Sequence, residues 1–205
     1  MFYEPRKGHG LPHDPFKAIV APRPIGWIST RSASGAVNLA PYSFFAAISS
    51  HPHLISFSSE GEKDSVAFAR ETGEFTANLV SADLFEAMNA SSVDAPRGTS
   101  EFAYAGLTAI AGTAVSAPRV GEAHAALECK VTEIRQPCGL DGKPAGVFVV
   151  TGEVVGIHID EAMLDNGIFD IRKAATVARL GYMDYTSVTG TFSARRPRWD
   201  AFKDT

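Results

Sequence analysis

The sequence predicts a mainly β protein, built as a closed barrel or a sandwich, with a few short helices. Short segments of apolar and polar alternation recur along the chain, and turn-forming residues separate them at regular intervals. Helical patterns are confined to short stretches. The alternation is strongest over 125–134, where Leu127, Cys129 and Val131 share one face, and the polar residues between them would form a solvated outer face.

Bulk properties indicate one globular domain. The chain has 205 residues, of which 45% are hydrophobic and 20% charged, and this is enough for one sizeable core. The net charge of −4 gives no reason to expect nucleic acid or an anionic membrane as a partner. Two cysteines are too few for a disulfide framework, and neither a signal-peptide core nor a membrane-spanning stretch is recognisable. We therefore expect a cytoplasmic protein.

The N-terminal part is interpreted as an arm followed by two strands. Residues 1–16 are polar and rich in proline and glycine, which is typical of an arm laid over a surface. Strands are expected over 17–20 and 25–31, with a proline-rich break between them.

The segment that follows carries the most informative pattern. Residues 32–35 have turn chemistry, and Val37 resumes the apolar pattern until Pro41 breaks it. Because proline has no N–H to donate to a ladder, this segment cannot be a regular central strand. An irregular backbone here would leave amides and carbonyls free to meet a flat ligand with a polar edge.

The later elements follow from local patterns. A helix is expected over 64–71, capped by Asp64 or Ser65. The other expected elements are strands over 53–59, 74–80, 125–134 and 147–159, a short helix over 82–90, a polar loop over 91–103 and a turn at 140–143.

Three segments are candidates for binding an anion. The loop 58–65 ends at the predicted helix N-terminus, where free amides, Lys63 and the hydroxyls of Ser58 and Ser65 could gather around a phosphate. The alternative is a capped helix beside a solvated lysine. Ser29 and Thr30 could hold ligand oxygens or be ordinary strand residues, and Arg97 could be a surface loop residue.

Other candidate residues give weaker evidence for a functional site. His51 and His53 flank a proline and fit an ordinary loop better than a metal site, so no metal is expected. His158 fits a structural role or a subunit contact, although it could reach a substrate, and Cys129 fits the core. No acid–base or nucleophilic motif identifies a catalytic residue, which is what a cofactor-borne redox reaction would leave.

Several motifs together resemble one family. The sequence reads PRPIGWIST at 22–30, NLAPYSFF at 38–45, KDS at 63–65, EFTANLV at 74–80 and RLGYMDYTSV at 179–188. This combination resembles the flavin reductase-like, flavoredoxin-like family of FMN-binding split-barrel proteins, from about Lys17 to Val188. The resemblance implies an FMN-binding split β-barrel with Greek-key connections over 17–190, a tail over 191–205, and a homodimer with FMN near the subunit interface.

The resemblance also assigns cofactor contacts. It implies that the segment from Asn38 to Ser43 contacts the isoalloxazine ring and that the segment from Arg97 to Ser100 covers the cofactor. The full set of expected FMN-binding residues is Trp27, Ser29, Thr30, Asn38, Leu39, Ala40, Pro41, Tyr42, Ser43, Ser58, Lys63, Asp64, Ser65 and Arg97. Of these, Ser29, Thr30, Ser58, Lys63 and Ser65 would hold the ribityl chain and phosphate.

Three functional readings remain open at the level of sequence. The first is an NAD(P)H-dependent flavin reductase, such as the reductase component of a monooxygenase. The second is a flavoredoxin-like FMN electron-transfer protein without nicotinamide activity, and the third is a non-catalytic ligand-binding split-barrel module. The choice between NADH and NADPH, and between a bound and an exchanging flavin, leaves no mark in the sequence.

Overall fold

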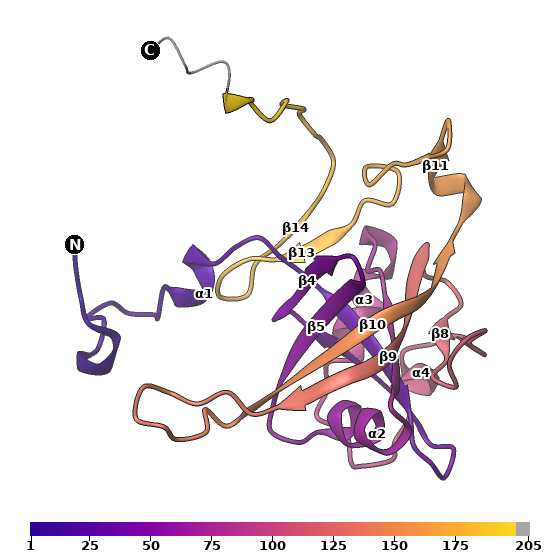
Figure 1. Ribbon diagram of the computed structural model, residues 1–205, viewed down its shortest axis with the longest axis horizontal. Coiled ribbons are helices and arrows are strands. Elements are labelled where there is room, and N and C mark those ends of the chain that lie inside the picture. The colour runs from indigo at the N-terminus through magenta and orange to yellow at the C-terminus, as the bar shows by residue number, and fades with distance from the viewer. Residues whose placement is uncertain (200–205) are drawn as a thin grey trace.

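A curled antiparallel sheet of seven strands forms the centre of the protein (Figure 1), as seen in a computed structural model that describes residues 1–199. The strands lie in the order β3-β2-β6-β9-β10-β5-β4. Their bounds are β2 Gly26–Arg31, β3 Val37–Tyr42, β4 Phe45–Ser50, β5 His53–Glu60, β6 Glu74–Asn78, β9 Ala125–Arg135 and β10 Val147–Ile159. The mainly β prediction is confirmed.

The two edges of this sheet are neighbours in sequence. β3 and β4 are the outermost strands, yet only Ser43 and Phe44 separate them. Three Cα–Cα steps of about 3.8 Å cannot bridge a flat seven-stranded sheet, so the sheet must curl until its edges meet. The ring of Phe45 packs so closely on Gly26 of β2 that a Cβ there would lie 2.5 Å from it. The result is a barrel that is almost closed.

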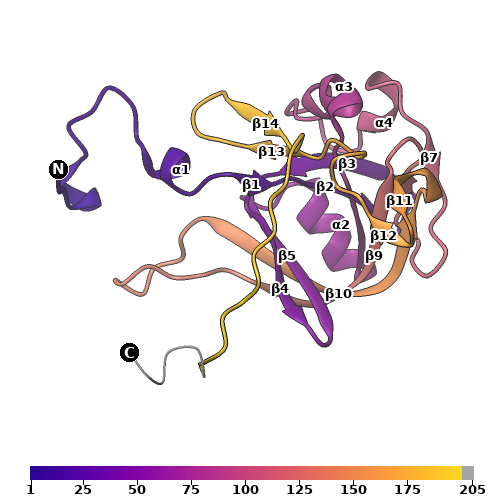
Figure 2. The same ribbon diagram turned by 90° about the horizontal axis from the view of Figure 1, so that it is seen from above.

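One helix plugs the curl. Helix α2 (Asp64–Thr72) lies inside the curved sheet (Figure 2) and buries Val66, Phe68 and Ala69. Its apolar side meets a core cluster that includes Phe57 and Phe75. The predicted strands over 25–31, 53–59, 74–80, 125–134 and 147–159 and the predicted helix over 64–71 are confirmed, apart from small shifts at their ends.

A second core lies on the other side of β2 and β3. Trp27, Leu39 and Met88 belong to it, covered by small elements from the rest of the chain. The remaining elements of the chain, of which only some contribute to this core, are η1 Pro5–Lys7, α1 Phe16–Ile19, β1 Arg23–Pro24, η2 Ala82–Leu84, α3 Phe85–Ala90, α4 Glu101–Tyr104, β7 Ala109–Ile110, β8 Arg119–Val120, η3 Glu161–Met163, β11 Leu164–Asp165, β12 Ile168–Phe169, β13 Val177–Arg179 and β14 Tyr185–Ser187. No helix in residues 1–199 is both long and apolar enough to cross a membrane.

The structure corrects two predictions in the N-terminal part of the chain. Residues 17–20 are not a strand: they belong mainly to α1, which follows a local turn in which the Phe16 amide donates to the Asp14 carboxylate at 2.9 Å. The predicted break at Pro41 is also wrong, because β3 continues to Tyr42. The rule behind it holds, since β3 is an edge strand.

Two further expectations around α2 and α4 are wrong. Neither Asp64 nor Ser65 caps α2: Lys63 occupies the N-cap position and provides no side-chain bond. Both predicted caps are engaged elsewhere, as described for the groove below. The loop expected over 91–103 ends early, because α4 begins at Glu101. The predicted tail 191–205 lies partly outside the described residues, which end at 199.

The polar face of the β9–β10 hairpin is not uniformly solvated, because Glu128 is fully buried. Its carboxylate accepts bonds from the amides of Thr113 at 2.7 Å and Val115 at 3.2 Å, and from that of Ala114. His158 Nε2 lies 2.6 Å from Glu128 Oε1. Burial alone would raise the pKa of Glu128, but the bonds from Thr113, His158 and Ala114 together lower it below its ordinary value.

Glu128 therefore links stability to pH. A lowered pKa in the folded state means that its contribution is present above the ordinary carboxylate pKa and is lost as the pH falls through the lowered value. We expect Glu128→Gln to reduce the free energy of unfolding at neutral pH by about 1–3 kcal/mol, because an amide NH₂ would face backbone donors. The acid-induced loss of stability should also become shallower. Urea denaturation across the acidic range measures both.

The matched control is Glu133→Gln, which changes an exposed carboxylate on the same strand. It should alter the free energy of unfolding by less than about 0.5 kcal/mol. Equal losses in the two variants would mean that the buried contacts of Glu128 contribute nothing specific.

Candidate functional site

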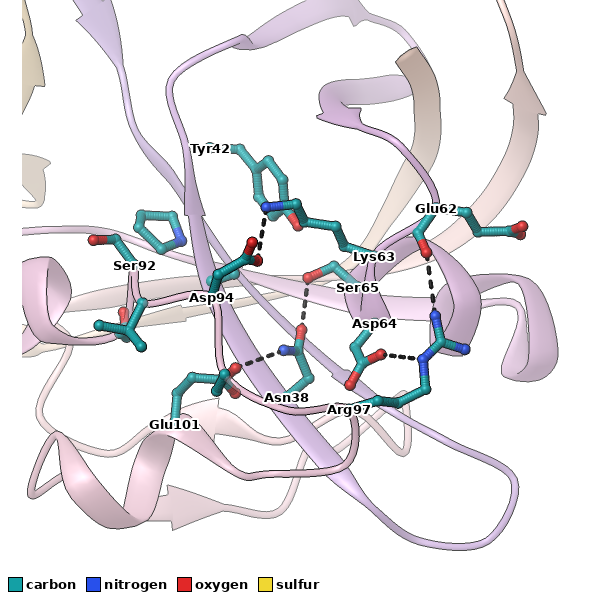
Figure 3. A pocket seen from close by; sticks show the side chains of 15 residues that line it. Asn38, Tyr42, Glu62, Lys63, Asp64, Ser65, Ser92, Asp94, Arg97 and Glu101 are labelled. Carbon is teal, nitrogen blue, oxygen red and sulfur yellow. Dashed lines mark hydrogen bonds and ion pairs between the residues drawn. The ribbon is translucent and has the colours of Figure 1, made fainter. Parts of the chain in front are cut away.

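A groove of about 380 Å³ runs between the edge strand β3, the start of α2 and the loop that leads to α4 (Figure 3). Three segments far apart in the sequence therefore form its walls. The residues that line it are Asn38, Ala40, Pro41, Tyr42, Glu62, Lys63, Asp64, Ser65, Ser91, Ser92, Val93, Asp94, Ala95, Arg97 and Glu101.

The first wall is the open edge of β3. This strand pairs only with β2, so every second residue turns its backbone groups away from the sheet. The Leu39 amide is one of these groups, and it donates to Glu101 Oε2 at 2.8 Å. Pro41 lies two residues further along and faces the same way, so its missing N–H removes no ladder bond. Its carbonyl is left available to a ligand on this edge.

A buried polar chain forms the floor of the groove. The Ser65 hydroxyl donates to Asn38 Oδ1 at 2.6 Å, and Asn38 Nδ2 donates to Glu101 Oε1 at 3.0 Å (Figure 3). All three residues are at most 5% exposed. The pKa of Glu101 is raised, mainly because burial penalises its charged form, although the bonds from the Leu39 amide and Asn38 oppose this. The chain fixes the Asn38 amide in one orientation.

Two cations lie at the α2 end of the groove, and each already has a carboxylate partner. Lys63 Nζ is 3.0 Å from Asp94 Oδ1, and Arg97 Nε is 3.0 Å from Asp64 Oδ1 (Figure 3). The bond to Asp94 is the main reason that the pKa of Lys63 is raised. Asp64 also accepts from the Gly98 amide at 2.9 Å, so its carboxylate points to the loop and does not cap α2.

The first amides of α2 complete this end. Within residues 1–199, no hydrogen bond uses the backbone amide of Asp64 or Ser65 as donor. Free amides at a helix start, with the positive end of the helix dipole, favour an anion. Lys63 and these amides therefore form a place where an anionic group would be stabilised.

The structure brings together eight of the fourteen residues expected to bind the cofactor. These eight line the groove: Asn38, Ala40, Pro41, Tyr42, Lys63, Asp64, Ser65 and Arg97. Their role as cofactor contacts remains a prediction. The other six are Trp27, Ser29, Thr30, Leu39, Ser43 and Ser58, and they do not line it.

The six lie elsewhere for clear reasons. Ser29 is fully buried, and its hydroxyl donates to the Pro118 carbonyl oxygen, with the Thr76 carbonyl oxygen 3.4 Å away, so it points away from the groove. Thr30 and Leu39 are also fully buried. The amide of Ser58 donates to the Phe44 carbonyl, which extends the pairing of β5 with β4. Ser43 lines a neighbouring pocket.

Trp27 has an indirect place in the site. Its indole Nε1 donates to Ser91 Oγ at 2.8 Å, and this ties the start of the groove loop to the core. Sequence reasoning missed Ser91, Asp94 and Glu101, because each reaches the groove only through tertiary contacts. A carboxylate in the first turn of a short helix carries no local signal that it will be buried.

Other candidate residues lie outside the groove. The rings of His51 and His53 are 5.7 Å apart at the β4–β5 turn, and His158 contacts Glu128. Within residues 1–199, no three His, Cys, Asp or Glu side chains gather as metal ligands would. Cys129 is fully buried in the core as predicted, and burial is the main reason that the pKa of its thiol is raised.

Comparison with known proteins identifies the family. Residues 20–184 match the model of the flavin reductase like domain. An uncharacterized protein of Halalkalibacterium halodurans is 37% identical over 183 residues, which is 87% of each chain.

Two solved structures share the fold. Component B of nitrilotriacetate monooxygenase from Bacillus cereus is 27% identical, with a TM-score of 0.86 over 95% of this chain and 98% of that one. Flavoredoxin of Desulfovibrio vulgaris is 26% identical, with a TM-score of 0.73 over 85% and 90%. The predicted split-barrel fold is confirmed, and this chain belongs to the flavin reductase-like domain family.

Proposed function

We propose that this flavin oxidoreductase is an NAD(P)H-dependent flavin reductase that binds FMN in the groove along β3. The observation that supports this most is the pairing of two features in one groove. An edge strand offers backbone groups to a flat ring, and the free amides at the start of α2, with Lys63 beside them, offer a place for a phosphate. FMN needs both.

The residues fit the group chemically. Asn38 keeps one N–H and one lone pair beyond its bonds to Glu101 and Ser65, so it can still pair with the polar rim of the ring. Lys63, Arg97 and the first amides of α2 would hold the phosphate. When bound, FMN would accept a hydride from a reduced nicotinamide and pass the electrons to an acceptor.

The protein's own part is binding and orientation. The chain from Ser65 through Asn38 to Glu101 fixes one wall before any ligand arrives, which reduces the ordering cost of binding. Tyr42 lies beside it, and burial is the main reason that the pKa of its phenol is raised, so the phenol stays neutral. No residue of the groove has to supply the electrons.

An electron-transfer protein without nicotinamide activity remains the second candidate. The specific observation in its favour is the fold shared with flavoredoxin at 26% identity, close to the 27% shared with the monooxygenase component. The non-catalytic module is disfavoured, because the edge of β3 that would face the ring and the start of α2 that would face the phosphate line the same groove.

The decisive experiment is the visible spectrum of the purified protein with FMN, followed by anaerobic addition of NADH and then NADPH. We expect the flavin absorbance to bleach with at least one nicotinamide. Bleaching by dithionite but by neither nicotinamide would reject the reductase and support the carrier. A spectrum with no bound flavin at micromolar FMN would contradict FMN as a resident cofactor.

The phosphate assignment is tested by comparing two flavins. Lys63→Ala removes one charge-assisted contact of about 1.5–3 kcal/mol, so FMN affinity should fall by about ten- to a hundredfold. Riboflavin has no phosphate, and its affinity should hardly change. Asp94→Asn should strengthen FMN binding, because it frees Lys63 from its carboxylate partner. Fluorescence titration of both flavins measures these effects.

The control for this test is Arg135→Gln, which changes a cation on β9 that pairs with Glu133 outside the groove. Equal losses of FMN and riboflavin in Lys63→Ala would indicate damage to the fold. An unchanged FMN affinity would leave Lys63 as a surface residue.

The working form is proposed to be a homodimer. An apolar surface pocket of about 300 Å³ lies beside β10, where Ile157 is 55% and Ile159 is 44% exposed. The N-terminal residues extend away from the barrel (Figures 1 and 2), and their exposed Met1 and Phe2 would gain cover from a second copy.

Light scattering should therefore give a dimer mass for the wild type. Ile157→Lys should shift the equilibrium to monomer, because it places a charge on the proposed contact. Leu140→Lys is the matched control, since Leu140 is 98% exposed on the β9–β10 loop, and it should leave the dimer intact. A monomeric wild type, with and without FMN, would reject the dimer.

A further inference from the structure

A second pocket, of about 320 Å³, adjoins the groove. Pro41 and Ser92 line both, so the two spaces are neighbours across the end of β3. We call it the basic pocket, because its charged lining residues are Lys17, Arg23 and Arg179. The groove differs from it, with two cations and four carboxylates.

None of the three cations has a carboxylate partner among residues 1–199. The sheet places two of them face to face, since Arg23 of β1 is paired directly with Arg179 of β13. Like charges at paired positions of an antiparallel ladder repel each other. An arrangement of this kind is stabilised by an anion between the charges.

Backbone carbonyl oxygens hold the Arg23 guanidinium in a fixed position. It is 7% exposed, and its guanidinium donates to the carbonyl oxygens of Leu180 at 2.7 Å, and of Lys17 and Val20. Its Nε is buried and has no partner in the described part of the chain. A guanidinium that is almost fully buried, lines a pocket and has no carboxylate partner among residues 1–199 points to a ligand with acceptor oxygens.

Arg179 is oriented by its neighbours. Its guanidinium donates to the Tyr182 carbonyl at 2.6 Å and lies 4.2 Å from the centre of the Tyr185 ring. Stacking on a ring fixes the plane of the guanidinium and leaves its remaining N–H groups for a second acceptor. Lys17 adds an exposed ammonium at the rim.

We propose that the basic pocket binds the phosphate groups of the nicotinamide dinucleotide, while its reactive ring enters the groove along β3. This rests on the proposed reductase function and names the residues that hold the donor. A dinucleotide carries its phosphates several bonds from its ring, which suits two adjoining spaces. Two guanidinium groups and an ammonium match the several oxygens of a pyrophosphate.

The test uses FMN-loaded protein and inorganic pyrophosphate, followed by calorimetry. Wild-type protein should bind pyrophosphate, and Arg179→Gln should weaken binding by about tenfold or more. Lys17→Gln should also weaken it, and this exposed side chain can be changed without risk to the fold. Arg135→Gln, a distant cation, should have no effect. Equal affinities in Arg179→Gln and Arg135→Gln would overturn the proposal.

Flavin titration separates the two anion sites. Neither basic-pocket variant should change the preference for FMN over riboflavin. A loss of FMN affinity but not riboflavin affinity in Arg179→Gln would overturn the proposal, because this pocket would then hold the flavin's own phosphate.

Anaerobic stopped-flow reduction tests the donor. Arg179→Gln should raise the nicotinamide concentration for half-maximal reduction and leave the limiting rate unchanged. A larger effect with NADPH than with NADH would place the 2′-phosphate in the pocket, and equal effects would place the pyrophosphate there. If wild-type protein binds pyrophosphate but neither nicotinamide reduces it, the reductase function fails and the donor assignment fails with it. Loss of pyrophosphate binding alone would overturn only the basic pocket.

Discussion

The two-residue link between β3 and β4 is the constraint on which the rest of the structure depends. It forces the first and last strands of a seven-stranded sheet together, so the sheet curls around α2. The closure is not a continuous ladder, since β3 pairs only with β2. The backbone edge that most proteins must protect is thereby left open at one place, beside the start of α2. The groove is a direct product of this geometry.

The polar interior follows from the same geometry. An open edge inside a folded protein leaves amides that need acceptors, and Glu101 provides one for Leu39. The bonds from Asn38 and the Leu39 amide compensate only in part for burying that carboxylate. Burial has the larger effect, so the pKa of Glu101 is raised. Glu128 is the contrasting case, because its several donors more than compensate for burial. Two buried carboxylates thus respond to pH in opposite directions.

Much of the fold could be predicted from the sequence because its strands carry local signals. Alternation in the β9–β10 hairpin and turn chemistry after β2 each identify an element without tertiary information. The errors share a cause. Lys17 lies in a short helix that follows a turn stabilised by Asp14, and Pro41 continues a strand because that strand lies at the edge of the sheet. Local sequence patterns reveal neither the turn that precedes a short helix nor the order of the strands in a sheet.

The residues of the candidate site also fall into two groups, those that local sequence motifs predict and those that only tertiary contacts bring to the groove. Asn38 to Tyr42 and Lys63 to Ser65 could be predicted because each is a contiguous motif. Ser29 has the same polar character, but strand alternation turns it to the opposite side. Asp94 lies in a loop, and Glu101 lies at the helix that follows it; the path of this loop depends on Trp27, a buried residue more than sixty positions earlier. That dependence is visible only in three dimensions.

The loop over the groove has a mechanical consequence. Its first residue, Ser91, is fixed to Trp27 in the core, and its last, Glu101, is fixed to β3. Between these anchors, the loop contacts the start of α2 through two ion pairs, Asp94 with Lys63 and Arg97 with Asp64, and through the bond from the Gly98 amide to Asp64. The loop is therefore anchored at both ends, and its middle is held to the start of α2 by these polar contacts. Exposed ion pairs such as Lys63 with Asp94 contribute little in water, so the middle of the loop would separate from α2 at a lower cost in free energy than either anchored end. If flavin binds in this groove as proposed, its rates of entry and release would then depend more on surface electrostatics than on the stability of the core.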